Sequence, residues 1–196
     1  MQDKSYGWPA LEEMGPRIVV CGPICSGKST LSLALAAKLN LTPIHLDELY
    51  LQPIKGHHAV PYAQFLRVHE DAIRADRWVV DGNHDGAVRS RLERATGLIY
   101  LHSRRPLALG RYVFRTFVTR RRFGFFEDIP ETFQWDAVRW LMRGSLGSLK
   151  TIRTLLHDSG KPLVEVDVEG GGLTQLYSRW GLTRPEAKTR RRFRGG

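Results

Sequence analysis

Short apolar runs alternate with longer segments of helical spacing along most of this chain. The apolar runs predict buried strands at 18–21, 43–47, 77–82, 97–101 and 162–167. The helical spacing predicts helices at 31–39, 62–75, 86–95 and 132–157, with a last short helix after 170–172. Strands that alternate with helices favour a parallel sheet covered on both faces. The predicted fold class is therefore α/β, with five parallel strands in one sheet.

A glycine-containing loop joins the first predicted strand to the first predicted helix. Residues 22–30 spell GPICSGKST, which fits G-x-x-x-x-G-K-[ST], the Walker A phosphate-binding loop. The strand before the loop and the helix after it are the context that this motif requires. Backbone N–H groups of such a loop and the positive end of the helix together attract phosphate oxygens. We expect nucleotide contacts from Gly22, Ile24, Cys25, Ser26, Gly27, Lys28, Ser29 and Thr30.

Two residue types of this motif carry specific chemistry, and an acid further along the chain complements them. Lys28 is expected to reach the β- and γ-phosphates of ATP, and the Ser29 hydroxyl to supply one oxygen ligand to Mg²⁺. Asp81 ends an apolar run after this loop, as the Walker B acid does, and is the expected second metal ligand. The alternative for Asp81 is an ordinary strand-end turn, Asp-Gly-Asn.

Further polar residues follow the predicted strands at the edge where a parallel sheet binds its ligands. Asp47 is the candidate to orient an acceptor hydroxyl and take its proton, and its alternative role is capping of a helix or turn. Arg89 and Arg91 are candidates to bind a phosphate or carboxylate of the acceptor. Asn83 and His84 complete the predicted substrate-binding set, and the alternative for His84 is an ordinary exposed loop histidine.

These motifs resemble the small P-loop kinases of the adenylate-kinase-like superfamily, most closely the FlaR-related group of DNA topology modulation proteins. The matching segments are the loop at 22–30, Leu46-Asp47, the run WVVDGN at 78–83 and an arginine-rich segment after the fourth strand, within residues 17–155. Adenylate kinases carry Asp-Gly-Phe-Pro-Arg where this chain has DGNHD at 81–85. That departure argues against an AMP-type acceptor.

The arginine-rich segment is expected to form a helical lid at about 104–134. Arg111 and Arg115 stand four residues apart, so on a helix they share one face and can both meet a triphosphate. Their spacing resembles the Arg-x-x-x-Arg of adenylate kinase lids. Arginine in this position offsets charge on the transferring phosphoryl group. The alternative is a solvated cationic helix face.

The charge of the chain is concentrated rather than general. The formal net charge is +10 over 196 residues; 104–122 carries +7 and the basic tail at 184–196 carries +5, so the rest of the chain carries −2. We expect one domain over 1–183 and a disordered tail. The first fifteen residues contain no continuous apolar stretch, which predicts neither a signal peptide nor a membrane span and favours a cytoplasmic location. Monomer and homodimer both remain open.

The sequence thus predicts an ATP- and Mg²⁺-dependent phosphotransferase that acts on a nucleoside, nucleotide or other small hydroxyl compound. One alternative is a nucleic-acid-associated NTPase or polynucleotide kinase, which would use the arginine-rich segment and the tail to hold phosphates along a strand. Another is a nucleotide-binding regulator that transfers no phosphate.

Overall fold

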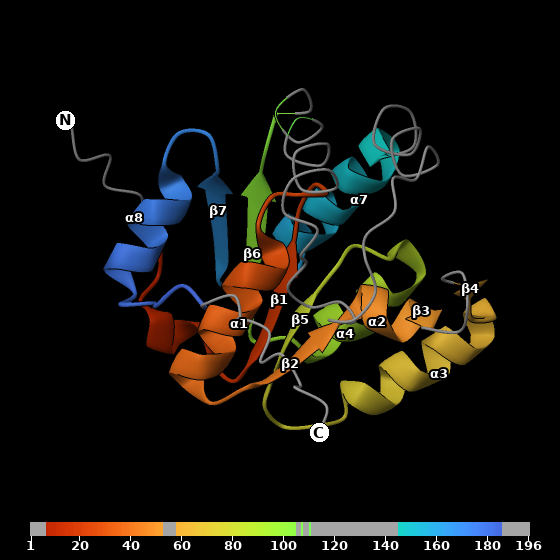
Figure 1. The fold of residues 1–196 in the computed structure, drawn as a ribbon. Coiled ribbons are helices and arrows are strands. Elements are labelled where there is room, and N and C mark those ends of the chain that lie inside the picture. The colour runs from red at the N-terminus through yellow and green to blue at the C-terminus, as the bar shows by residue number, and fades with distance from the viewer. Residues whose placement is uncertain (1–6, 53–57, 105–106, 108–109, 111–144, 186–196) are drawn as a thin grey trace, which may run out of the picture.

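A five-stranded parallel sheet forms the centre of the molecule (Figure 1). The computed structural model describes residues 7–52, 58–104, 107, 110 and 145–185. The strand order is β2-β5-β1-β6-β7, and all four neighbouring pairs are parallel. In that order the strands are β2 (Thr42–His45), β5 (Trp78–Asp81), β1 (Arg17–Cys21), β6 (Gly97–His102) and β7 (Leu163–Asp167).

Helices cover both faces of this sheet, as the sequence predicts. One face carries α1 (Lys28–Leu39) and α8 (Gly172–Arg179), and the other carries α4 (Val88–Arg94) and α7 (Ser145–Asp158). The remaining elements are the 3-10 helices η1 (Leu11–Met14) and η2 (Asp85–Ala87), α2 (Leu46–Tyr50), α3 (Tyr62–Ala72), and the antiparallel pair β3 (Leu51–Gln52) and β4 (His58–Ala59). Among the described helices, none combines the length and the apolar character needed to cross a bilayer.

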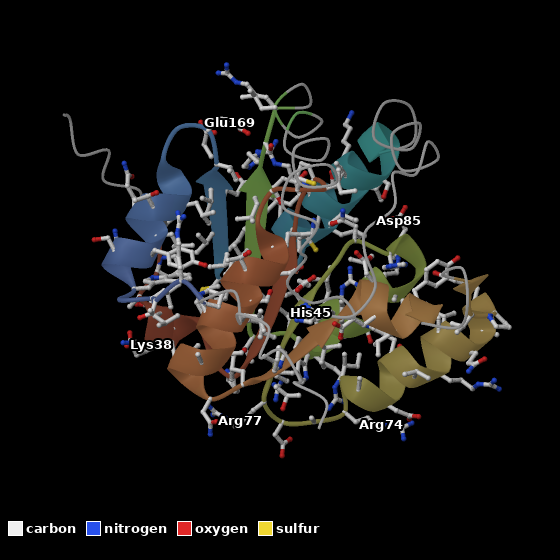
Figure 2. The ribbon with its side chains drawn as sticks, in the orientation of Figure 1. Lys38, His45, Arg74, Arg77, Asp85 and Glu169 are labelled. Atoms are coloured by element: carbon white, nitrogen blue, oxygen red, sulfur yellow. The ribbon has the colours of Figure 1, made fainter. Side chains whose placement is uncertain are left out.

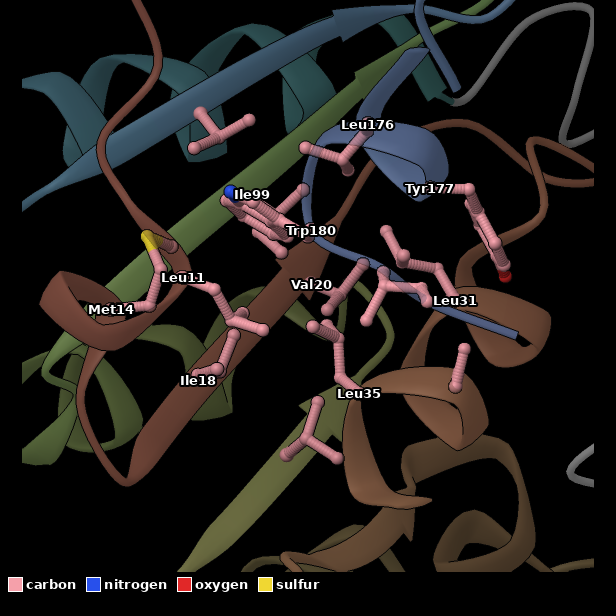
Figure 3. Packing of buried hydrophobic residues seen from close by; sticks show 14 of the residues in the cluster. Leu11, Met14, Ile18, Val20, Leu31, Leu35, Ile99, Leu176, Tyr177 and Trp180 are labelled. Atoms are coloured by element: carbon pink, nitrogen blue, oxygen red, sulfur yellow. The ribbon is translucent and has the colours of Figure 1, made fainter. Parts of the chain in front are cut away.

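Alternation along the strands builds two separate cores. Ile18 and Val20 of β1 join the cluster under α1 and α8, whereas Val19 and Cys21 join the cluster under α3, α4 and α7. This follows from the strand period of two residues, which sends neighbouring side chains to opposite faces. Each fully buried aliphatic side chain of this kind contributes about 1.5–3 kcal/mol to stability. Figure 3 shows the first cluster, in which side chains of α1 and α8 meet those of β1 and β6.

The register of the sheet decides which polar residues become neighbours. In the β2–β5 pair, His45 lies opposite Asp81, and in the β1–β5 pair, Val20 lies opposite Asp81. Because the strands are parallel, their carboxyl ends all lie at one edge of the sheet. The loop after β1 therefore begins beside the acid that ends β5.

The second strand corrects one sequence-based boundary. We expected it to run through Asp47, but β2 ends at His45 and Asp47 lies in the first turn of α2. Asp47 and Glu48 both stand in that first turn, where carboxylates stabilise the positive end of a helix, and Leu46 is buried beneath it. The β3–β4 pair was not predicted.

Several expectations fall outside the described residues. They are most of the lid at 104–134, including Arg111 and Arg115, the amino-terminal part of the helix expected at 132–157, and nearly all of the basic tail at 184–196.

Candidate active site

The phosphate-binding loop turns sharply out of the sheet after β1 and enters α1. Gly22 has φ 142°, and a Cβ built there would stand 2.5 Å from Leu101 O of β6. Gly27 directly precedes α1 and has φ 94°, in the left-handed region. Both positions therefore require glycine, the first for close approach of two backbones and the second for its conformation.

Lys28 is the first residue of α1, and its side chain lies over the loop. Its Nζ donates a hydrogen bond to Pro23 O at 2.7 Å. The Ser26 hydroxyl is buried, with 2% of the residue exposed, and its Oγ has no hydrogen-bond partner among the described residues. The first turn of α1 contains no acid. A positive helix end, an ammonium group and a buried unpartnered hydroxyl together fit a polyphosphate anion.

The rest of the predicted loop contacts are placed beside this centre. Ile24 and Cys25 are half-buried in the loop, and Cys25 has φ 57°. Thr30 lies in the first turn of α1, and its carbonyl oxygen accepts a hydrogen bond from the Tyr177 hydroxyl of α8 at 3.2 Å. The helix that presents the loop is thus fixed from the side of α8.

The Asp81 carboxylate joins the loop to the end of β2. Its Oδ1 accepts a hydrogen bond from Ser29 Oγ at 3.3 Å, and its Oδ2 lies 2.5 Å from His45 Nδ1. His45 and Asp81 are both buried. Burial opposes protonation of His45, but the hydrogen bond and the charge of Asp81 outweigh burial, so the pKa of His45 is raised. In Figure 2, His45 lies near the centre of the molecule, where β2 ends and α2 begins.

The Ser29 and Asp81 oxygens fit a Mg²⁺ ion in their chemistry. Both are hard oxygen donors, which Mg²⁺ prefers, and the 3.3 Å between them places them at one point beside the loop. Sequence reasoning identified this pair but missed His45, which holds the other oxygen of the carboxylate. The sequence did contain a signal for His45: it is a polar residue near the end of an apolar run, and that run ends at the same sheet edge as Asp81.

The candidate acceptor side contains Asp47 and His84. His84 Nε2 lies 3.6 Å from Asp47 Oδ1, and the Asp47 side chain is 41% exposed. The His84 ring packs against Phe65 of α3 and Tyr50 of α2, with ring centroids 4.7 and 5.1 Å apart. The structure therefore brings two predicted substrate residues together, one on α2 and one after β5.

The other predicted acceptor residues make different contacts from this pair. Arg89 is exposed on α4, whereas Arg91 is fully buried. Arg91 Nη2 donates to Gly82 O at 3.1 Å and to Asn83 O at 2.8 Å. The Asn83 side chain is bonded to the backbone of Gly22. In this structure Arg91 and Asn83 hold protein backbone, and their contacts with an acceptor stay untested predictions.

Comparison with solved structures addresses the fold. The chain is similar to a gluconokinase from Sinorhizobium meliloti 1021, with a TM-score of 0.54 and 17% identity over 86% of this chain and 93% of that chain. The chain has the fold of a P-loop NTPase. A shikimate kinase from Aquifex aeolicus shares 17% identity, with a TM-score of 0.48 over 84% of this chain and 96% of that chain. No protein-family model matches the chain, and no curated protein matches it in sequence. At this identity, the gluconokinase likeness establishes the P-loop NTPase fold alone.

Proposed function

We propose that this protein is a Mg-ATP-dependent phosphotransferase that moves the γ-phosphoryl group to a hydroxyl of a small acceptor. The observation that carries the proposal is the Ser29–Asp81 contact at the phosphate-binding loop, with Lys28 beside it. Binding of a triphosphate needs only the loop. A carboxylate on the neighbouring α2, Asp47, adds a base where an acceptor can approach.

The protein's own groups divide the work between the two substrates. The loop amides and Lys28 bind the phosphates, and Ser29 and Asp81 hold the metal. When bound, Mg²⁺ neutralises charge on the β- and γ-phosphates. Asp47 orients the acceptor hydroxyl and takes its proton as the acceptor O–P bond forms and the bond from Pγ to the ADP oxygen breaks. Catalysis rests on positioning and charge stabilisation.

The acceptor is proposed as a class. The gluconokinase, by its name, acts on gluconate, a small hydroxyl compound, and this chain shares its fold. We extend the class to nucleosides and nucleotides. AMP is left out of it because the DGNHD segment at 81–85 lacks the arginine of the adenylate kinase motif. Arg111 and Arg115 are proposed lid residues, and membership of the FlaR-related group is proposed from the sequence.

The test is ADP release that depends on an acceptor. The full chain is mixed with Mg-ATP and a panel of nucleosides, nucleotides, sugars and short oligonucleotides, while Mg-ADP binding is measured in parallel by calorimetry. We expect one small hydroxyl compound to stimulate ADP release and Asp47→Asn to remove the stimulation. Stimulation by oligonucleotides alone would favour the polynucleotide alternative. Tight Mg-ADP binding without stimulation by any acceptor would favour a regulator, and either outcome overturns the proposal.

A further inference from the structure

The Asn83 side chain forms hydrogen bonds with both the backbone N–H and the backbone C=O of Gly22, the first residue of the loop. Its Oδ1 accepts a hydrogen bond from Gly22 N at 3.2 Å, and its Nδ2 donates to Gly22 O at 2.9 Å. A carboxamide offers a donor and an acceptor side by side, so one side chain satisfies both groups of one peptide residue. No backbone group among the described residues bonds Gly22 N or O, because the strand ladder has already stopped.

This contact continues the β1–β5 ladder beyond the ends of the two strands. The last backbone rung between them is Gly82 N to Val20 O at 3.3 Å. The Asn83 side chain then replaces the backbone for the next rung. On the opposite side of β1, Leu101 of β6 stands against Gly22. Gly22 is therefore held between β6 and Asn83, and this fixes the direction in which the loop leaves the sheet.

Arg91 fixes the backbone from which Asn83 projects. Its Nη2 bonds both Gly82 O and Asn83 O, and its side chain is fully buried. Its Nε and Nη1 have no hydrogen-bond partner among the described residues. A buried guanidinium with unpartnered nitrogens costs stability that an apolar side chain of the same size would not cost. Arg91 also interacts with the Cys21 side chain of β1, and the two carbonyl bonds connect it to Asn83.

We propose that Asn83 is a positioning residue for the nucleotide-binding loop, that Arg91 acts through it, and that the pair sets nucleotide affinity. The proposal rests on the proposed function in one respect, that the loop binds nucleotide. A loop held in its binding shape before the ligand arrives loses less entropy on binding. Asparagine also suits the site better than aspartate, because a carboxylate would lose the bond to Gly22 O and place negative charge beside a phosphate site.

The decisive experiment measures Mg-ADP affinity by calorimetry for the wild type, Asn83→Ala and Asn83→Asp. The loss of two hydrogen bonds predicts about a tenfold weaker Kd for Asn83→Ala, and the added charge predicts about a hundredfold for Asn83→Asp. Thr96→Val is the matched control. Thr96 Oγ1 accepts from Arg17 N at 2.9 Å and donates to Met14 O at 2.8 Å, so it makes a similar bond at the opposite end of β1. We expect this control to lower Tm and leave the Kd unchanged.

Amide hydrogen exchange tests the two hydrogen bonds between Asn83 and Gly22 without any nucleotide. Asn83→Ala should speed exchange of the Gly22 amide about tenfold or more, and Thr96→Val should not. Unchanged exchange in Asn83→Ala would overturn the proposal even if the wild type binds no ADP. A wild type that binds no ADP, with faster exchange in the variant, would overturn the proposed function and the effect on affinity, and would leave the positioning role of Asn83 supported. Mg-ADP affinities of both Asn83 variants within twofold of wild type would overturn the proposal that Asn83 positions the loop.

Arg91 is tested through its dependence on Asn83. Arg91→Lys keeps a cationic donor and should fold, and we expect about a threefold weaker Kd. Because Arg91 acts through Asn83, adding Arg91→Lys to Asn83→Ala should weaken binding no further. Fully additive losses would contradict that link.

Discussion

The two edges of the central sheet are built from different kinds of contact. At the amino ends of the strands, long cationic side chains donate to backbone carbonyls. Arg77 Nη2 bonds Leu39 O of α1, and Arg77 Nε bonds Asn40 O. Lys161 Nζ donates to three carbonyl oxygens at the end of α4, those of Leu92, Glu93 and Ala95. Each cation thus forms hydrogen bonds with carbonyl oxygens at the carboxyl end of a helix.

At the carboxyl ends of the strands, short polar side chains meet one another. Ser29, Asp81 and His45 form one connected set, and Asp47 and His84 form a pair beside it. Lys28 and Arg91 also donate to backbone carbonyls at this edge, but those carbonyls belong to the loops after β1 and β5. In the described part of the chain, no cation at this edge donates to the carbonyl oxygens at the carboxyl end of a helix.

The direction of the helices explains the difference. Helices that follow parallel strands run back along the sheet, so their negative carboxyl ends collect at the amino edge and their positive ends at the other. Cations at the amino edge stabilise the fold, and the opposite edge keeps positive potential for an anionic ligand. Substitutions at the first edge should therefore change stability and substitutions at the second should change activity.

Lys28→Ala should give the largest effect on activity. Removal of the ammonium beside the phosphates is expected to lower ADP production by about 10²–10³-fold, because a preorganised charge at the transferring group is lost. The change is measured by steady-state kinetics, and Tm should stay within a few degrees of wild type.

Lys38→Ala is the matched control for this loss. Lys38 is an exposed residue in the last turn of the same helix, at the amino edge, so its removal should leave turnover unchanged and lower Tm slightly. Full activity in Lys28→Ala would show that the phosphate-binding loop takes no part in the reaction.

Asp47→Asn should give the second largest effect and separate chemistry from binding. Loss of a general base predicts a fall in kcat of about 10²-fold, whereas Mg-ADP affinity should stay within twofold. Glu48→Gln changes the next carboxylate of α2 and should leave kcat nearly unchanged. Equal kcat in Asp47→Asn and wild type would show that another group takes the proton.

Local sequence was sufficient for the parts of this fold that depend on short-range pattern. The apolar runs predicted all five strands of the sheet within a few residues, and the loop at 22–30 predicted the turn between β1 and α1. The end of β2 was wrong because strand and helix signals overlap at Leu46-Asp47-Glu48, where acids that favour a first helical turn directly follow an apolar run.

The roles of side chains that reach across the sheet were harder to predict. Asn83 contacts Gly22 only because β1 and β5 pair in one particular register, and a single sequence does not state that register. The burial of Arg91 had a local signal. It stands three residues after the buried Val88 and next to the buried Leu92, whereas Arg89 falls on the exposed side of α4.

Lys161→Met sharpens the comparison from the amino edge. Methionine keeps most of the apolar stem but removes bonds to three carbonyl oxygens at the end of α4. Hydrogen bonds to a charged group predict a loss of about 1.5–3 kcal/mol in the free energy of unfolding, measured by urea denaturation. Mg-ADP affinity should not change. A large change in affinity with little change in stability would contradict the division between the two edges.

Glu165 gives the smallest effect and lies at neither edge. It stands in the middle of β7, where it accepts hydrogen bonds from Arg153 Nε at 2.7 Å and from His157 Nε2 at 3.1 Å, both on α7. The bond from Arg153, opposed by burial and helped by His157, lowers the pKa of Glu165 from 4.5 to about 2.

A lowered carboxylate pKa stabilises the folded protein above the unfolded pKa, and this stability is lost as the pH falls through the folded pKa. The stabilisation from Glu165 should therefore be complete above about pH 4.5 and disappear toward pH 2. Because the cluster is partly exposed, we expect about 1–2 kcal/mol rather than the full value of the shift. Urea denaturation at pH 6 and pH 3 should show a smaller acid-induced loss for Glu165→Gln than for wild type. An equal loss in both proteins would place the acid sensitivity of the fold in other carboxylates.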